Sequence, residues 1–282
     1  MAEINIHPTA RSLGAEILDV DITDLSQDDF ERIRSAYIEH GVIFLRDQKL
    51  SPEQHIEFAE RWGTINVNRF FTPVEKYGQI AEVRKEADQT FNIGGSWHTD
   101  HSYDTVPAMG SILLAREVPL TGGDTLFASM YAAYEGLSDE FKKTIEGLDA
   151  VHSSRHVFGA ETRENQEFEG RFGNSAAATQ DAVHPVVIVH PESGRKALYV
   201  NPGFTVGIKG WSAEESQALL KFLYQHAVRP EFTCRFHWQP GSIAFWDNRA
   251  TWHYALNDYQ GQRRLMHRIT LEGSPLGRAT EA

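Results

Sequence analysis

The chain has 282 residues, of which 41% are hydrophobic and 23% charged, the composition of a globular protein large enough to bury a core without disulfides or a structural metal. Its formal net charge at pH 7 is −12 and it has no basic run, so non-specific nucleic-acid binding is not expected. No apolar run approaches the ~20 residues of a membrane span, the start lacks a secretion signal, and the single cysteine, Cys234, allows no internal disulfide, which together predict a cytoplasmic protein without a membrane partner.

The first part of the chain predicts short strands followed by two helices. Residues 1–25 have the pattern of short strands and turns. Ser26 is a typical helix N-cap and Gly41 a typical helix end, and the apolar Val42–Leu45 that follows predicts a buried strand. A second helix is predicted from the capping box of Ser51-Pro52-Glu53-Gln54.

The middle of the chain is less regular. Strands are expected near residues 79–84 and over Met109–Arg116, and a helix over Ser138–Leu148. Residues 159–182 are polar, rich in Gly and Glu, and without periodicity. A loop this long inside a compact domain is usually functional or disordered, so it is either a lid over the site or a mobile surface loop.

The last part predicts mainly strands. Pro191–Gly194 is a turn between two strand-like segments, Val183–His190 and Arg195–Val200, and Ser212 caps a helix that runs to about Ala227. Further strands are expected at Phe232–Trp238, Ile243–Trp246 and Arg264–Leu271, and the tail from Gly273 is expected to fray. Without a repeat or a linker-like tract, the chain predicts one β-rich domain with helices packed around the sheet.

His98 and Asp100 place an imidazole and a carboxylate two residues apart, within Gly94-Gly95-Ser96-Trp97-His98-Thr99-Asp100. On an extended strand, residues i and i+2 point to the same face, so this segment can offer a nitrogen and an oxygen ligand to one metal ion. The pair is weak evidence alone, because about one such spacing is expected by chance in a chain with 13 histidines. The alternative is a hydrogen-bonded His–Asp pair in a loop.

His253 is the candidate for a third ligand. It follows a strand and a polar turn in Phe245–His253, from which an inward-pointing imidazole can meet the first pair. Two imidazoles and one carboxylate form the facial triad of non-haem Fe(II) oxygenases, which leaves coordination positions open. A structural zinc site would be closed and rich in thiolates, which one cysteine cannot supply.

Arg264 and Arg268 lie four residues apart on the strand after His253 and are therefore expected on one face. A 2-oxo acid that chelates iron has a far carboxylate that needs a cation, and a guanidinium can donate two parallel hydrogen bonds to it. Thr125, after the turn Gly122-Gly123-Asp124, can add a hydroxyl. The alternative is an ordinary pair of surface arginines.

Four segments together resemble the taurine/2,4-D-type (TauD/TfdA) dioxygenases: Trp97–Asp100, Gly122–Thr125, Trp246–Arg249 with His253, and Arg264 with Arg268. They match in order and spacing, and the resemblance extends from about Ile4 to Leu271. It implies a β-rich α+β fold with a double-stranded β-helix (jelly-roll, cupin-like) core and flanking helices. Residues 1–282 are then expected to form a single dioxygenase domain.

The resemblance also implies cofactors and roles. Fe(II) would be held by His98, Asp100 and His253, and the distal carboxylate of the co-substrate 2-oxoglutarate by Arg264 and Thr125. Arg268 would lie beside the iron and assist the co-substrate or an anionic substrate. The implied reaction uses O₂ to hydroxylate a C–H bond of a small organic anion, with succinate and CO₂ as co-products. A homo-oligomer is the expected assembly.

The sequence departs from the taurine enzymes at the substrate positions. Those enzymes carry a His shortly after the Phe-Gly that corresponds here to Trp62-Gly63, where this chain has Asn66-Val67-Asn68-Arg69. They also carry Asp-Asn before the Trp-His, where this chain has Ile93-Gly94-Gly95-Ser96. Because burying an ammonium without an acidic partner is costly, taurine itself is not the expected substrate.

Other segments are more similar to members that cleave aryloxypropionate herbicides or alkyl sulfates, namely Val83–Ala87, Val151–Gly159 and Phe222–His226. In those enzymes, hydroxylation at the carbon that bears oxygen gives a product that falls apart. Substrate contacts are expected from Asn68, Arg69, His101, Tyr103, Phe158, Phe204 and Arg268, with ordinary packing or surface positions as the alternative.

Two other functions remain open from the sequence alone. One is a taurine or sulfonate dioxygenase with a rewired amine pocket, and the other is a non-catalytic jelly-roll that binds a ligand. The second is less favoured, because a silent protein has no chemical need for all three metal ligands together with Thr125, Arg264 and Arg268.

Overall fold

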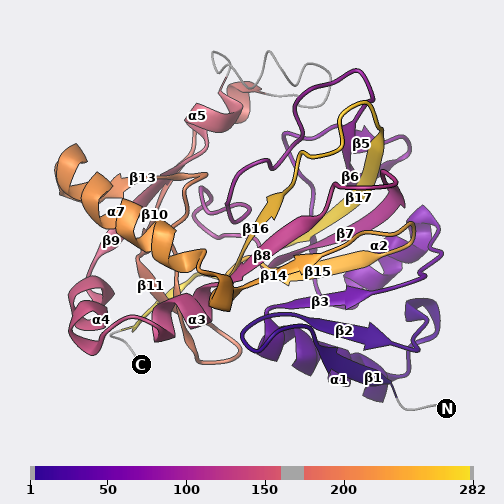
Figure 1. Cartoon of the computed structure of the whole chain (residues 1–282), viewed down its shortest axis with the longest axis horizontal. Helices are drawn as coiled ribbons and strands as arrows, with labels where there is room; N and C mark the ends of the chain where they lie inside the picture. Colours follow the sequence, from indigo (N-terminus) through magenta and orange to yellow (C-terminus); the bar gives the residue numbers. More distant parts are fainter. Residues whose placement is uncertain (1–3, 160–174, 280–282) are drawn as a thin grey trace.

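Four β-sheets form the framework of this computed structural model, which describes residues 4–159 and 175–279 (Figure 1). The largest sheet has the order β1-β2-β3-β15-β7-β17-β6-β5, with β4 paired to β17, and all of its neighbours are antiparallel except β2 and β3. Its strands are β1 (Asn5–Pro8), β2 (Ala15–Leu18), β3 (Val42–Leu45), β4 (Ile65–Asn66), β5 (Pro73–Val74), β6 (Tyr77–Lys85), β7 (Gly110–Glu117), β15 (Ile243–Asp247) and β17 (Arg264–Leu271).

Three smaller sheets have three strands each. The sheet β14-β8-β16 carries the candidate ligand His253 and consists of β8 (Thr125–Ser129), β14 (Thr233–Phe236) and β16 (Thr251–Ala255). The other two have the orders β10-β9-β13 and β12-β11-β18. Their strands are β9 (Asp149–Ser153), β10 (Asp181–Pro185), β11 (Val187–Val189), β12 (Lys196–Leu198), β13 (Thr205–Ile208) and β18 (Gly277–Arg278).

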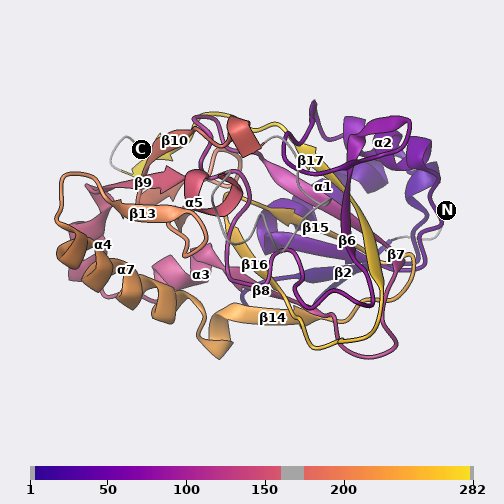
Figure 2. The same cartoon turned by 90° about the horizontal axis from the view of Figure 1, so that it is seen from above.

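The helices gather at two ends of the molecule. Figure 2 shows α1 and α2 at one end and α4 and α7 at the other. The helices are α1 (Gln27–His40), α2 (Pro52–Glu60), α3 (Met130–Glu135), α4 (Asp139–Glu146), α5 (Arg155–Phe158) and α7 (Ala213–Ala227), with 3-10 turns at Ile22–Asp24, Ser175–Ala177 and Pro230–Phe232. None of the described helices is both long and apolar enough to cross a membrane.

The predicted caps fix the helix boundaries. Ser26 accepts a hydrogen bond from the Asp29 amide at 3.1 Å, and Gly41 ends α1 in the left-handed conformation with φ 70°. Ser51 and Ser212 each form a capping box, in which the helix residue three positions later bonds back to the cap. These starts and stops depend only on local residues, which is why the sequence predicts them.

The alternation of side chains along β15 separates two parts of the core. Ile243 and Phe245 pack with α1 and α2 on the outer face of the large sheet. Ala244 and Trp246 point the other way, into a cluster that includes Phe127 from the small sheet. The expected β-rich α+β fold is confirmed, and the inner layer between β15, β7, β17 and the small sheet is where the candidate site lies.

The segment 183–190, expected as one arm of a hairpin, divides between two sheets at Val186. The Val186 amide donates to Leu148 O at 2.9 Å, and its carbonyl accepts from the Tyr199 amide at 2.8 Å. The strand therefore changes partner there, and only β11 and β12 form the predicted hairpin.

The tail expected to fray from Gly273 is held through residue 279. β18 pairs with β11, and Arg278 forms an ion pair with Asp149 at 2.5 Å. Ala279 is buried in the cluster under α3 and α7. Most of the lid expected at 159–182 lies outside the described residues, and its described end includes the start of β10.

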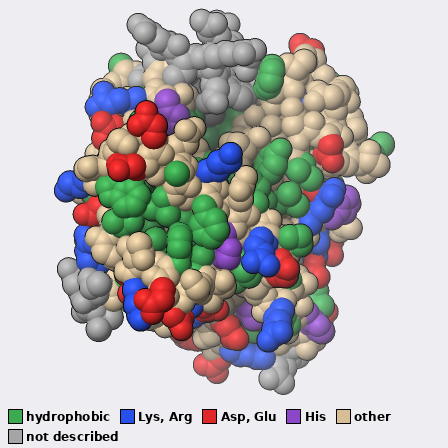
Figure 3. All heavy atoms as spheres, turned by 60° about the vertical axis from the view of Figure 1, so that its left-hand side comes forward, with side chains coloured by type: hydrophobic (Ala, Val, Ile, Leu, Met, Phe, Trp, Pro, Cys, Tyr) green, Lys and Arg blue, Asp and Glu red, His purple; other side chains and the backbone are tan. Residues whose placement is uncertain are grey.

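Figure 3 shows hydrophobic side chains gathered on the face that carries α7 and β13. Val206 on β13 and Phe222 on α7 are exposed hydrophobic residues.

Candidate metal and co-substrate site

His98 and His253 are held side by side by their own backbones. Each donates its amide to the carbonyl of the other, at 3.1 and 2.9 Å, in a single antiparallel bridge. The ring centroids lie 4.1 Å apart. The spacing predicts a regular strand at His98, but His98 forms only a single bridge to β16. That bridge orients the His98 side chain as a strand would.

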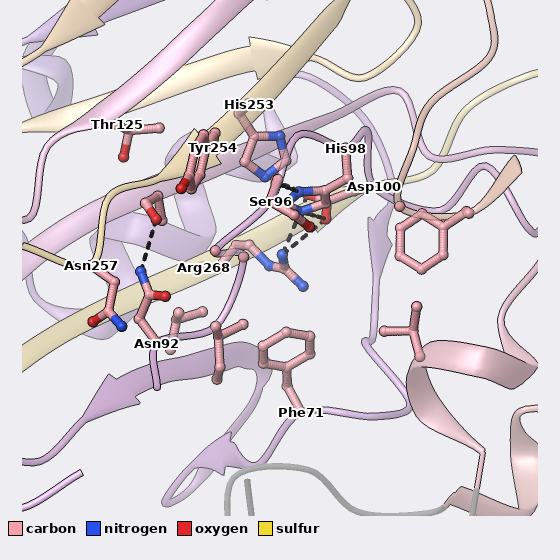
Figure 4. Close-up of a pocket in the computed structure, with 18 of the residues that line it drawn as sticks. Phe71, Asn92, Ser96, His98, Asp100, Thr125, His253, Tyr254, Asn257 and Arg268 are labelled. Atoms are coloured by element: carbon pink, nitrogen blue, oxygen red, sulfur yellow. Dashed lines mark hydrogen bonds and ion pairs between the residues drawn. The ribbon is translucent and has the colours of Figure 1, made fainter. Parts of the chain in front are cut away.

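Asp100 completes a cluster of three ligand groups. One ligand atom from each of His98, Asp100 and His253 lies within 4.8 Å of the others. His98 Nε2 is 3.8 Å from Asp100 Oδ1, and His253 Nε2 is 3.9 Å from Asp100 Oδ2. Figure 4 shows the three side chains pointing toward one another. Among the described residues this is the group with a metal-binding arrangement.

The protonation states suit a cation. Burial lowers the pKa of His98, and it lowers the pKa of His253 further because His98 is close by. Both imidazoles are therefore neutral near pH 7, the form that binds metal. Burial alone would raise the pKa of Asp100, but Arg268, His253 and His98 outweigh it and hold that pKa well below its usual range.

The contacts behind the ligands orient them. His98 Nδ1 lies 2.8 Å from Ser96 O, and donation of its proton to that carbonyl leaves Nε2 free for a metal. The His253 ring packs against Trp246, at 4.6 Å between centroids. Two neutral imidazoles and one carboxylate form a donor set that fits Fe(II), with open positions for further ligands.

Arg264 lies on the inner face of β17, buried and short of partners. Its Nε and Nη2 have no hydrogen-bond partner among the described residues. Burial lowers the pKa of Arg264, with Tyr259 and Asp124 opposing that effect. The Thr125 hydroxyl, which accepts from Trp238 Nε1 at 2.9 Å, lines the same cavity. A buried guanidinium with unpaired donors beside a hydroxyl fits the distal carboxylate of 2-oxoglutarate.

Arg268 occupies the space between the ligand cluster and an aromatic ring. Its Nη1 lies 3.3 Å from both oxygens of Asp100, and its guanidinium lies 4.4 Å from the centroid of the Phe71 ring. Figure 4 shows Arg268 reaching toward Asp100, with Phe71 beside it. Arg264 and Arg268 share a face of β17 as the spacing predicts, but they meet different parts of the site.

The ligands, both arginines and Thr125 open into one cavity of about 790 Å³. Such a volume is within the range of small-molecule sites. The three aromatic residues among the expected substrate contacts, Tyr103, Phe158 and Phe204, line it, and with Phe70 and Phe71 they form an aromatic cluster. Asp100 is the only carboxylate among the described residues that line it.

Asn68, Arg69 and His101 are brought together, but not at the cavity wall. Among the described lining residues none of the three appears. Arg69 pairs with Asp104 at 2.5 Å, His101 Nδ1 lies 2.8 Å from the same carboxylate, and Asn68 Nδ2 lies 3.3 Å from His101 Nε2. Their roles as substrate contacts stay predictions.

Further lining residues are not assigned a role by the sequence. They include Phe71, Asn92, His156, Trp246 and Asn257. Asn92 Nδ2 donates to Ala255 O at 2.8 Å, and Asn257 accepts from Lys85 at 2.9 Å. Trp246 begins the motif Trp246–Arg249, which could have placed it at the site. Single asparagines in loops, such as Asn92 and Asn257, give no such signal.

Comparison with known families decides the classification. The model of the family "Taurine catabolism dioxygenase TauD, TfdA family" matches residues 5–270. The chain belongs to this family. The match spans both candidate ligand segments and both arginines of β17, so the resemblance seen in the sequence is confirmed.

The TauD/TfdA relatives cover nearly the whole chain. An alpha-ketoglutarate-dependent sulfate ester dioxygenase of Pseudomonas putida is 35% identical, over 98% of this chain and 92% of the relative. An (S)-phenoxypropionate/alpha-ketoglutarate-dioxygenase of Sphingobium herbicidovorans is 30% identical, over 96% of each. The expected likeness to alkyl-sulfate and aryloxypropionate members is confirmed by these two.

A solved structure agrees. The crystal structure of a taurine dioxygenase from Burkholderia xenovorans has a TM-score of 0.83 and 33% sequence identity, and the alignment covers 100% of this chain and 95% of that one. The chain is therefore an alpha-ketoglutarate-dependent (2-oxoglutarate-dependent) dioxygenase of the TauD/TfdA family, whose members use Fe(II) and O₂.

Proposed function

We propose that this dioxygenase hydroxylates a C–H bond next to a heteroatom of a small organic anion, with sulfate esters and aryloxyalkanoates as the first candidates. The observation that carries the proposal is the cavity itself. It joins the three metal ligands to two buried arginines and an aromatic wall, and Asp100 is its only carboxylate among the described lining residues. The Pseudomonas and Sphingobium relatives act on a sulfate ester and on phenoxypropionate.

His98, Asp100 and His253 are the proposed ligands of Fe(II). The iron and 2-oxoglutarate, when bound, supply the oxidising chemistry that inserts one oxygen atom of O₂ into the C–H bond and yields succinate and CO₂. The protein contributes the ligand geometry. His98 and His253 are locked by their reciprocal backbone hydrogen bonds, and Ser96 fixes the tautomer of His98.

Arg264 and Thr125 are proposed to hold the distal carboxylate of 2-oxoglutarate. The unpaired Nε and Nη2 of Arg264 support this role, because a planar guanidinium can donate both hydrogen bonds to one carboxylate. Trp238 donates to the Thr125 hydroxyl oxygen, so the single Thr125 proton is free to be donated to the co-substrate.

The aromatic wall is proposed to place the substrate. Phe204 faces the His98 ring at 6.2 Å between centroids and contacts Tyr103 at 4.8 Å. An apolar alkyl or aryl group packed there has its C–H bonds next to the metal ligands, and the same packing excludes water. Arg268 is the proposed partner of an anionic group.

Hydroxylation at a carbon that bears an ester or ether oxygen gives an unstable product. The new hydroxyl loses its proton as its oxygen forms a carbonyl, and the bond from carbon to the ester or ether oxygen breaks. A sulfate ester then gives an aldehyde or ketone and inorganic sulfate, whereas an aryloxyalkanoate gives a 2-oxo acid and a phenol.

Sulfonates are the second candidate substrates, because the taurine dioxygenase of known structure shares the fold over the whole chain. Taurine itself is disfavoured. Its ammonium would lie in a cavity whose described lining residues include no carboxylate other than Asp100. Asp100 is already engaged with Arg268. A sulfonate without an amine has no such cost.

We also propose that the large sheet and the sheet β14-β8-β16 are the two sides of a double-stranded β-helix. The inner residues of β15 and β8 share one cluster, which supports this reading. The single domain, the lid, the homo-oligomer and the cytoplasmic location stay predictions.

The test has two stages. Anaerobic addition of Fe(II) and 2-oxoglutarate should give a weak visible absorption band in the wild type. His98→Ala should lose the band, whereas His7→Ala, at an exposed histidine on β1, should keep it. A wild type without the band refutes the metal and co-substrate sites.

A substrate panel is the second stage. Sulfate esters, aryloxyalkanoates and sulfonates would be compared by succinate formation, with release of sulfate, phenol or sulfite, respectively, as a check on coupling. Strong turnover of taurine, with none of the other anions, would contradict the proposed substrate class.

A further inference from the structure

Ser111 touches the metal ligand Asp100 from behind. It lies on β7 and is fully buried, and its hydroxyl donates to Asp100 Oδ2 at 2.9 Å. The sequence gives no hint of this contact, because Ser111 is a single small residue in an apolar strand. Any role of Ser111 toward a metal rests on the proposed iron site.

Among the described residues, Asp100 Oδ2 is the acceptor of the Ser111 proton. Asn248 Nδ2 approaches the Ser111 oxygen at 3.5 Å, and the backbone N–H of Asn248 donates to Met109 O at 3.0 Å. With Asn248 as a weak donor on one side, the Ser111 proton points to Asp100. Thr99, between the ligands His98 and Asp100, donates to Asn248 O at 2.5 Å. Ser111 and Thr99 thus tie the ligand segment to the turn before His253.

Arg268 competes for the same carboxylate. Its Nη1 is 3.3 Å from both oxygens of Asp100, too long for a strong charge-assisted bond. The torsion that turns an aspartate carboxylate is soft. Arg268 already faces both oxygens, so without the Ser111 contact the carboxylate can shift closer to the guanidinium and away from the two imidazoles.

We propose that Ser111 is a positioning residue that holds Asp100 as a one-oxygen metal ligand. The hydroxyl occupies Oδ2 and leaves Oδ1, 3.8 Å from His98 Nε2, for the metal. One oxygen and two imidazole nitrogens leave three positions open, which the co-substrate and O₂ require. A carboxylate that bound through both oxygens would take one of those positions.

The test is the metal affinity of Ser111→Ala. Anaerobic titration with Fe(II) at saturating 2-oxoglutarate, followed by the visible band, should show affinity roughly 10-fold weaker than the wild type, the lower end of what loss of a contact behind a ligand costs. Calorimetric titration with Co(II) alone gives the same comparison without turnover. Ser111→Thr keeps the hydroxyl and should recover most of the affinity.

Thr270→Val is the matched control. Thr270 lies directly opposite Ser111 on β17, is also buried, and its hydroxyl has no hydrogen-bond partner in the described part of the chain. Its replacement should leave metal affinity within about twofold of the wild type, because no contact to a ligand is lost. Equal losses of metal affinity in Thr270→Val and Ser111→Ala would overturn the proposal, because removal of any buried hydroxyl would then weaken metal binding.

The outcomes separate the two proposals. A wild type that binds Fe(II) and a Ser111→Ala variant that binds it equally well would refute the role of Ser111 and leave the iron site standing. A wild type that binds neither Fe(II) nor Co(II) would refute the iron site itself. Ser111→Cys keeps the side-chain volume and supplies only a weak S–H donor, so it serves the same comparison if the alanine variant does not fold.

Discussion

Arg264 and Arg268 lie four residues apart on the same face of β17, yet only Arg268 has a carboxylate beside it. Arg268 is 3.3 Å from both oxygens of Asp100, whereas Nε and Nη2 of Arg264 have no partner among the described residues. A buried, unpaired guanidinium is unfavourable. Metal binding adds a second charge imbalance, because Asp100 is then shared between a cation and Arg268. The site is therefore short of anionic groups, which an anionic co-substrate and an anionic substrate supply.

The first prediction concerns Arg264→Ala. The KM for 2-oxoglutarate should rise roughly 10–100-fold, because hydrogen bonds between charged groups contribute about 1.5–3 kcal/mol. Succinate formation at varied 2-oxoglutarate measures the effect. Arg263→Ala is the matched control, since Arg263 is the preceding residue but is half-exposed and paired with Glu86 and Glu117. An unchanged KM in Arg264→Ala would show that the co-substrate carboxylate lies elsewhere.

The second prediction concerns removal of the metal. The protein should stay folded after chelation, because its core clusters lie on both faces of the large sheet and need no ion. Fe(II) at about 100 times its Kd should raise the free energy of unfolding by about 2.7 kcal/mol. Anaerobic denaturant titration measures this difference. His98→Ala should remove it, and a chelated protein that is unfolded would contradict the prediction.

Part of the candidate site was predictable because its signals are local or periodic. His98 and Asp100 are close in sequence, and Arg264 and Arg268 follow the two-residue period of a strand. The caps of α1, α2 and α7 are local in the same sense. Chemistry within a few residues decides each of these features, so little of the tertiary fold has to be known.

Contacts between distant segments were not predictable. Ser111 meets Asp100 because β7 passes behind the ligand loop, and nothing in the strand Gly110–Glu117 marks it. Asn68, Arg69 and His101 were expected at the substrate, but Asp104 gathers Arg69 and His101 into a network away from the cavity lining. A charged side chain near a site pairs with the nearest buried polar group, and the tertiary structure decides which group that is.

The third prediction concerns stability at acid pH. Burial lowers the pKa of His55 and of His152 from 6.5 to about 3. Because the folded pKa lies below the unfolded one, protonation favours the unfolded state, so stability is complete above about pH 6.5 and falls steadily toward pH 3. Each histidine should remove about 2 kcal/mol between pH 7 and pH 5. Denaturant titrations across this range measure the loss.

His55→Leu isolates one of these contributions. Neither ring nitrogen of His55 has a hydrogen-bond partner in the described chain, so leucine leaves no partner unpaired. The variant should match or exceed wild-type stability at pH 7 and lose about 2 kcal/mol less on going to pH 5. Exposed His7→Leu should follow the wild-type profile. A His55→Leu profile parallel to the wild type would refute a buried, neutral His55.

The last prediction concerns the aromatic wall. Phe204 is buried beside Tyr103 and the proposed metal ligand His98, so Phe204→Ala opens a space where the substrate's alkyl or aryl group is proposed to pack. The KM for the best anionic substrate should rise roughly 10–100-fold, because full burial of such a side chain contributes about 1.5–3 kcal/mol, while the KM for 2-oxoglutarate should change less than about threefold. Phe222→Ala, at an exposed phenylalanine on α7, should change neither. The split between the two constants separates a substrate wall from a general packing role, because a general loss of packing would raise both together.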